Sequence, residues 1–196
     1  MEAELPEGLI RGRYILMVGT IEPRKGHRLL LDVWRDLIAR GVPQQIGFTL
    51  VFAGRRGWKT EALMREIDAE TRPHFVHLHD VWDARLERLY RDCAFCVLPS
   101  IYEGFGLPVI EAFSHGKAII SSTGGSLPEV VGDLSPCLDL AHPEAWRALI
   151  ERWMVDPDAR HPYEQRILTS FRRPEWSAAA AGFWRAALDE EGQELP

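Results

Sequence analysis

The sequence has few cysteines, and they lack the pattern of a disulfide framework. Cysteine accounts for three of the 196 residues, which is an odd number and too few for a disulfide scaffold, so we predict a reducing environment. Cys93 and Cys96 have CxxC spacing, but zinc needs four ligands and neither a second CxxC nor an HxxxH accompanies them. We therefore interpret both as buried structural thiols.

Long hydrophobic runs and an excess of basic residues are also missing. The apolar runs are far shorter than the roughly 20 residues of a membrane-spanning helix. The N-terminal segment MEAELPEGL is acidic and has no apolar signal-peptide region. The net charge of −6 argues against non-specific nucleic-acid binding. We expect a cytoplasmic protein with no nucleic-acid partner, in which an anionic ligand would be held by a few local cations.

Short apolar runs alternate with amphipathic segments along most of the chain. We predict strands at residues 14–18, 48–53, 75–78, 94–98, 118–121 and 137–140. We predict helices at residues 26–40, 60–69, 84–91, 108–115, from 127, 144–154, 158–171 and 176–190. The alternation indicates an α/β fold, a Rossmann-like doubly wound parallel sheet with helices on both faces.

The same alternation gives the domain organisation. We interpret residues 1–13 as a linker or leader, residues 14–190 as one Rossmann-like domain, and residues 191–196 as a frayed tail. Parallel sheets of this kind bind ligands at the carboxyl ends of their strands, beside the N-termini of helices.

The stretch SIYEGFGLPVIEAFSHG, residues 100–116, has the features of such a ligand site. Pro108 suits the first turn of a helix, which makes Leu107 the expected N-cap. Leucine has no oxygen to accept from the free N–H groups, so the helix end is open to an external anion such as a phosphate. Gly104 and Gly106 allow backbone amides to approach a ligand closely. The alternative is an ordinary strand-turn-helix corner.

Within this stretch two acids bracket the Gly-Phe-Gly turn and the proline. Glu103 lies on the loop and Glu111 about one turn into the helix, where carboxylates can accept hydrogen bonds from the hydroxyls of a sugar or a ribose. The alternative is that both are solvated surface glutamates.

Two further stretches precede helices. Arg24 and Lys25 follow the first expected strand, at the ligand edge of the sheet, where they suit phosphate contact unless they form a solvated basic turn. In STGGSLPEVVG, Ser126 and Glu129 have the S-x-x-E spacing of a capping box, so this helix is expected to satisfy its own first turn.

At these stretches the chain resembles the retaining glycosyltransferases of family 4, also called group 1, which have the GT-B fold. The matching segments, in the order of the family, are VGTIEPRKGH, LVFAGRRGWKTE, LYRDCAFCVLPS, YEGFGLPVIEAFSHGKAIISS and GGSLPEVVGD. The family has two Rossmann-like domains, of which the C-terminal one holds the nucleotide-sugar donor. The resemblance implies that this chain is that domain, with an acceptor-binding N-terminal domain missing. The segments TIEPRKG and AGRRGWK are most similar to those of a subgroup of mannosyltransferases that build bacterial surface polysaccharides.

The resemblance also implies roles for individual residues. Glu103 would contact the hydroxyls of the donor sugar, and Glu111 would hold the ribose diol. Lys25, with Arg24, would neutralise the diphosphate leaving group. Family members commonly have an arginine where this chain has Thr20, and the resemblance to the subgroup with EPRK implies that Arg24 supplies that charge instead. The residues expected at the donor site are Thr20, Arg24, Lys25, Glu103, Gly104, Phe105, Gly106, Leu107 and Glu111.

The resemblance implies transfer of a sugar with retention, from a GDP- or UDP-sugar and without an essential metal or cofactor. GDP-mannose is the expected donor, and contact with a membrane would require the absent domain. Two other functions stay open: a non-catalytic nucleotide-sugar-binding module or one subunit of a split transferase, and a fragment of a nucleotide-sugar epimerase. His77 and His79 alternate on an expected strand and could pair on a metal, but we interpret them as structural because the sequence shows no third ligand nearby.

Overall fold

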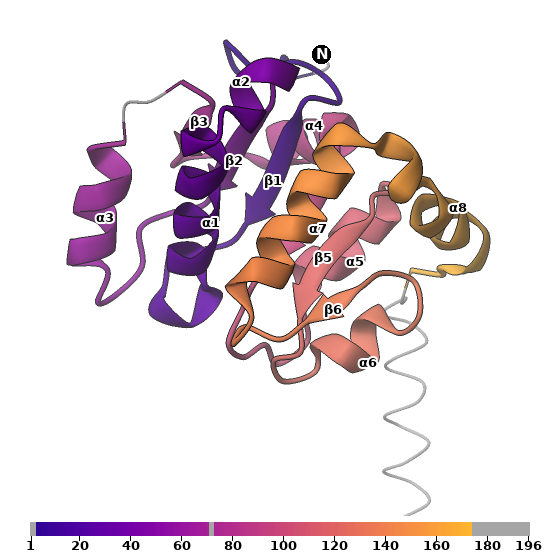
Figure 1. Ribbon diagram of the computed structural model, residues 1–196. Coiled ribbons are helices and arrows are strands. Elements are labelled where there is room, and N and C mark those ends of the chain that lie inside the picture. Colours follow the sequence, from indigo (N-terminus) through magenta and orange to yellow (C-terminus); the bar gives the residue numbers. More distant parts are fainter. Residues whose placement is uncertain (1–2, 71–72, 174–196) are drawn as a thin grey trace, which may run out of the picture.

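The computed structural model describes residues 3–70 and 73–173, and within them six parallel strands form one sheet (Figure 1). The strands are β1 (Tyr14–Val18), β2 (Thr49–Ala53), β3 (Phe75–Leu78), β4 (Phe95–Leu98), β5 (Ile119–Ser122) and β6 (Cys137–Leu138). Their order is β3-β2-β1-β4-β5-β6, and every neighbouring pair is parallel. The Rossmann-like fold class predicted from the alternation is therefore confirmed.

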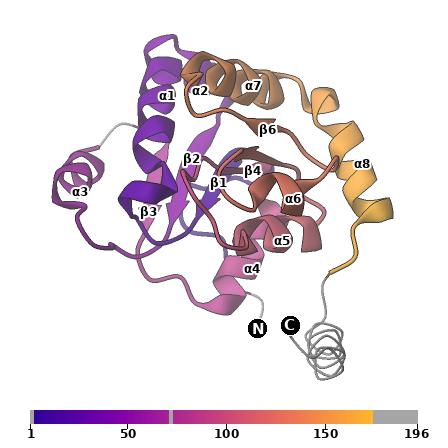
Figure 2. The ribbon, with the colours of Figure 1, turned by 90° about the horizontal axis from the view of Figure 1, so that it is seen from below.

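Helices occupy the connections between strands, two more follow the last strand, and together they cover both faces of the sheet. The α-helices are α1 (His27–Ala39), α2 (Val42–Ile46), α3 (Glu61–Asp68), α4 (Asp83–Asp92), α5 (Leu107–Ser114), α6 (Leu127–Val131), α7 (Pro143–Val155) and α8 (His161–Ser170). Two short 3-10 helices are η1 (Pro23–Lys25) and η2 (Pro157–Ala159). Helices α1, α2 and α7 lie on one face, and α4 and α5 lie on the other (Figure 2).

The central strands are apolar throughout because both of their faces are covered. All four residues of β4 are buried, as are the first four of β1. Trp34 of α1 and the α7 residues Trp146 and Trp153 are fully buried against the sheet, where large aromatic side chains contribute most to the buried apolar area.

The segment after α1 differs from the prediction. Gly41 and Pro43 indicated only the end of a helix, but a second helix, α2, begins at Val42 with Pro43 in its first turn. Proline is tolerated there because the first-turn N–H groups have no intrahelical acceptor. The predicted helix at 158–171 is likewise divided into η2 and α8.

The ends of the domain are only partly described. Residues 3–13, predicted as a linker, contact the domain, since Leu9 is buried in the core and the N–H of Gly12 donates to the carbonyl of Asp92. The predicted helix at 176–190 and the tail at 191–196 lie outside the described residues. Among the residues described, none of the helices has the length and apolar character needed to cross a bilayer.

Candidate functional site

The candidate site lies where the loops that follow β1 and β4 meet. These strands are neighbours in the sheet although β4 comes fourth in the chain, so their carboxyl ends flank the point where the strand order reverses, the usual ligand position in such folds. The N–H of Ile101 donates to the carbonyl of Arg24 at 2.7 Å. Gly26, at φ 75°, packs so closely that a Cβ atom there would lie 1.8 Å from the carbonyl oxygen of Pro99. The two loops therefore form one surface.

A buried ion pair occupies the centre of this surface. The Nζ atom of Lys25 lies 2.6 Å from Oε1 of Glu103, and both side chains are about nine-tenths buried. The hydroxyl of Ser100 donates to the same oxygen at 2.7 Å. The guanidinium of Arg24 lies 3.3 Å from the other oxygen, Oε2, and also pairs with Glu22 at 3.0 Å. The structure thus brings together Arg24, Lys25 and Glu103, the three residues expected to carry catalysis.

These contacts determine the ionisation of Glu103. Burial alone would raise the pKa of this carboxyl, but hydrogen bonds from Lys25 and Ser100 and the nearby positive charges outweigh it, so the pKa lies below its ordinary value. Glu103 is therefore a carboxylate at neutral pH and can only accept hydrogen bonds.

The loop after Glu103 leads into an uncapped helix. The N-cap of α5 is Gly106, at φ 78°, and not Leu107 as predicted, and no side chain in residues 3–70 or 73–173 caps the helix. Glycine takes this position because its backbone is left-handed, while Leu107 already has helical geometry. The side chains of Phe105 and Leu107 are exposed. In the first turn Pro108 has no N–H and the N–H of Val109 donates to the carbonyl of Gly106 at 2.9 Å, so the N–H of Leu107 is the one left for an anion.

Glu111 lies farther along α5, in a separate hollow. Its Oε2 accepts from the hydroxyl of Tyr90 at 2.7 Å. The hollow, of about 310 Å³, lies between α4 and α5, and its lining includes Glu111, Tyr90, Leu107 and Ile110. No contact joins Glu111 to Glu103 in the structure: Glu103 lies on the loop that leads into α5, and Glu111 lies on α5 itself.

The segment 124–126 braces the Glu103 loop, a role that the sequence did not indicate. Both the backbone N–H and the hydroxyl of Ser126 donate to the carbonyl of Glu103, at 3.0 and 3.1 Å. A Cβ atom on Gly125, at φ 62°, would lie 2.3 Å from that same oxygen. The predicted Ser126–Glu129 capping box is therefore wrong, because Ser126 donates across to another loop and makes no side-chain cap to α6.

The other predicted site residues lie around this cluster without joining its hydrogen bonds. Thr20 and Gly104 are both exposed on the surface, Thr20 after β1 and Gly104 after β4. The prediction of structural thiols is confirmed for Cys93 and Cys96, which are both buried and free.

Comparison with known proteins gives the chain its family. The family model described as "Glycosyl transferases group 1" matches residues 7–167. The chain is 35% identical over 164 residues to O-antigen chain mannosyltransferase B of Escherichia coli, covering 83% of this chain and 42% of that protein. It is also 35% identical over 139 residues to MMP alpha-(1->4)-mannosyltransferase of Mycolicibacterium hassiacum, covering 70% of this chain and 32% of that protein.

A solved structure has the same fold. The C-terminal domain of the group 1 glycosyl transferase LpcC from Francisella tularensis superposes with a TM-score of 0.67 at 18% identity, covering 83% of this chain and 86% of that one. The fold and the loop surface define a Rossmann-like domain with a ligand edge at its strand reversal. The chain belongs to the glycosyl transferases group 1 family. It spans roughly two fifths or less of the length of the two curated relatives above.

Proposed function

We propose that this chain is the nucleotide-sugar-binding domain of a retaining glycosyltransferase and that the donor is GDP-mannose. The observation that carries the proposal is the buried Lys25–Glu103 pair beside the uncapped N-terminus of α5. It places cations, a carboxylate and free backbone amides on one surface. A sugar diphosphate needs these three kinds of group, since its phosphates accept hydrogen bonds and its hydroxyls donate them.

The hydrogen bonds of Glu103 leave room for a sugar hydroxyl. A carboxylate has about four acceptor positions. Lys25 and Ser100 both donate to Oε1, and Arg24 donates to Oε2, which leaves a lone pair of Oε2 for a substrate. Glu103 thus acts as a fixed acceptor for the sugar, oriented by three protein donors.

The leaving diphosphate would be stabilised by the groups around it. The amide of Leu107 at the start of α5 and the ammonium of Lys25 are already positioned, so they stabilise developing negative charge at little cost in reorganisation. Arg24 is half exposed and is shared between Glu22 and Glu103. Its guanidinium would turn away from Glu22 to contact a phosphate. In this proposal, fixed cations and amides offset the charge of the leaving group.

Glu111 would accept from the ribose diol. Its carboxylate is held by Tyr90 in the hollow between α4 and α5, on the helix whose N-terminus would bind the diphosphate. The two named relatives are mannosyltransferases, which supports mannose as the sugar. Because the chain spans under half of either relative, transfer to an acceptor is proposed to require a second domain.

Calorimetric titration of the purified chain with GDP, UDP and ADP tests the proposal. We expect GDP to bind saturably. Lys25→Ala should lower the affinity for GDP and for pyrophosphate alike. Glu111→Ala should lower the affinity for GDP but leave that for pyrophosphate unchanged, because only GDP has a ribose. The exposed residues Lys59 and Glu144, changed to alanine, are the matched controls.

The sugar contact needs a separate comparison. We expect GDP-mannose to bind more tightly than GDP, and the near-isosteric Glu103→Gln to remove most of that advantage. GDP binding that neither Lys25→Ala nor Glu111→Ala weakens, in chains that remain folded by circular dichroism, would contradict the proposed site.

A further inference from the structure

Three side chains that can ligate a metal come together at the edge of the sheet, away from the site above. Asp68 is the last residue of α3, His77 lies on the edge strand β3, and His79 follows that strand. One ligand atom from each lies within 4.8 Å of the other two. The third ligand that the sequence around His77 and His79 did not show is therefore supplied by the fold.

The hydrogen bond of His77 selects a ligating tautomer. Nε2 of His77 lies 3.0 Å from the carbonyl oxygen of Gly54. A carbonyl only accepts, so Nε2 carries the hydrogen and Nδ1 is left with a free lone pair. Nδ1 is buried and has no hydrogen-bond partner in the described part of the chain. Metal-bound histidines usually have this arrangement, in which a backbone carbonyl fixes the ring through its second nitrogen.

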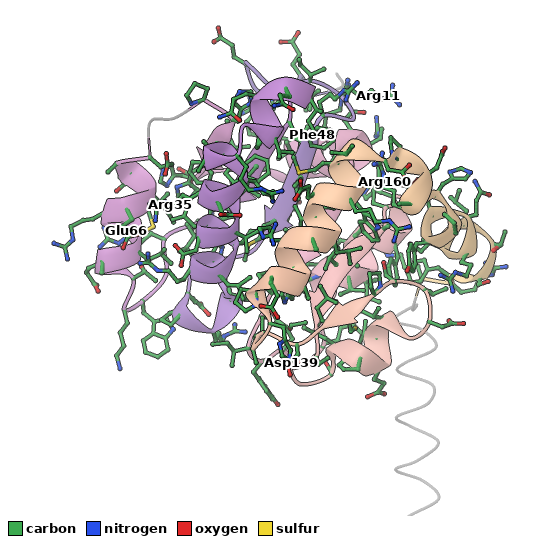
Figure 3. The ribbon with its side chains drawn as sticks, viewed as in Figure 1. Arg11, Arg35, Phe48, Glu66, Asp139 and Arg160 are labelled. Atoms are coloured by element: carbon green, nitrogen blue, oxygen red, sulfur yellow. The ribbon has the colours of Figure 1, made fainter. Side chains whose placement is uncertain are left out.

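The positions of the three residues follow from well-held elements. His77 and His79 are two residues apart at the end of β3, so they share one side of the sheet, and their ring centroids are 3.9 Å apart. Helix α3 is held by its buried residues Met64 and Ile67. It is also held by the pair between Glu66 and Arg35 of α1 (Figure 3). The backbone of Asp68 is thereby held close to the two imidazoles.

We propose that Asp68, His77 and His79 form a binding site for a divalent transition metal, with Zn²⁺ the best fit. Two imidazoles and one carboxylate suit zinc, whereas Mg²⁺ and Ca²⁺ prefer ligand sets made of oxygen. Around a tetrahedral zinc the ligand atoms are about 3.4 Å apart, from bonds of about 2.1 Å. Asp68 and His79 are exposed, so their side chains can close the remaining distance. A water or one further ligand would complete the coordination.

The metal would connect two elements that the sheet does not join directly. It would link the C-terminus of α3 to the edge strand β3 through side chains. The carbonyl that orients His77 belongs to Gly54, which packs against the loop after β1, since a Cβ atom there would lie 2.0 Å from the carbonyl oxygen of Gly19. The site uses none of the residues assigned to the donor and does not depend on the proposed function.

Zinc binding to the untagged chain, freed of metal with a chelator, tests the site. Titration in competition with a chromophoric chelator should give one Zn²⁺ per chain. Asp68→Asn and His79→Ala should each weaken the affinity at least about tenfold. His161→Ala removes an exposed histidine outside the cluster and should bind like the parent chain. Co²⁺ should give the intense visible absorption of a tetrahedral site in the parent and not in the two ligand variants.

The possible results separate the site from non-specific binding. Stoichiometric binding that either ligand variant leaves unchanged would show that the three residues do not act together. Equal weakening by His161→Ala, or the lack of saturable binding to the parent chain, would also overturn the site. Circular dichroism serves as the folding control for Asp68→Asn, and its nucleotide titration is compared with that of the parent. It should match the parent chain whether or not that chain binds nucleotide, so the two proposals fail independently.

Discussion

The ammonium of Lys25 lies 2.6 Å from a carboxylate oxygen of Glu103, although 78 positions separate the two residues in the chain. The contact exists because β1 and β4 are neighbours in the sheet and the loops after them are joined by the hydrogen bond from Ile101 to Arg24. Both charges are largely withdrawn from water, so each depends on the other for compensation.

Removing one partner of this pair should cost stability. In Lys25→Ala the buried carboxylate loses its main partner, and we expect the free energy of unfolding to fall by about 3 kcal/mol. Urea unfolding followed by circular dichroism measures the change. The double variant Lys25→Met/Glu103→Gln should recover part of the loss, because no uncompensated charge is left. A double variant less stable than Lys25→Ala would show that the pair is not the source of the effect.

Releasing Arg24 from Glu22 should strengthen binding of the proposed ligand. Glu22→Gln removes the charge that holds the guanidinium at 3.0 Å. A partly exposed pair of this kind contributes up to about 1 kcal/mol, so we expect the affinity for GDP to rise about two- to fivefold in calorimetry. Glu144→Gln, at an exposed site outside the cluster, should change nothing. A weaker affinity in Glu22→Gln would mean that Glu22 itself contacts the ligand.

Gly125 should tolerate no side chain. Gly125→Ala would place a Cβ atom 2.3 Å from the carbonyl oxygen of Glu103 at a left-handed φ of 62°, which costs of order 1–3 kcal/mol of strain. We expect a lower melting temperature and weaker GDP binding, because the loop that carries Glu103 must shift. Gly132→Ala is the control, since it also has positive φ, 56°, but no atom within 4 Å of its Cβ position. Equal loss of GDP affinity in both variants would refute the bracing role.

The stability of the domain should depend on pH through His27. This residue is 1% exposed, neither ring nitrogen has a hydrogen-bond partner among the described residues, and burial lowers its pKa from 6.5 to about 3. Between those values the unfolded chain binds a proton that the folded chain does not, so stability falls as the pH drops below 6.5. The contribution of His27 to the free energy of unfolding should fall by about 2 kcal/mol between pH 7.5 and pH 5.

The variant His27→Leu isolates this contribution. Urea unfolding measures the free energy of unfolding of the parent chain and of His27→Leu. Between pH 7.5 and pH 5 this free energy should fall less in the variant than in the parent. His161→Ala, which removes an exposed histidine, should keep the pH dependence of the parent. An unchanged pH dependence in His27→Leu would show that His27 binds protons alike in the folded and unfolded chains.

Local sequence predicted the sheet well and the details of the site less well. The buried strands read as continuous apolar runs because both faces of a parallel sheet are covered, and Arg24, Lys25 and Glu103 were placed at one edge by the same topology. The role of Ser126 and the approach of Asp68 to His77 could not be predicted. Each depends on a partner in another element, and nothing in the local spacing distinguishes Ser126 from an ordinary capping residue.

The sheet order also determines when the site can exist. The segment before α1 supplies both cations, and the segment after β4 supplies the acid, so neither stretch of chain holds the ion pair alone. The two segments meet only when Ile15 pairs with Phe95 and Leu16 with Cys96. A slip of one residue in this pairing would turn the side chains of β4 to the wrong face. An anion should therefore bind at this surface only in chains whose central β1–β4 register is correct. Anion binding would then indicate that folding is complete.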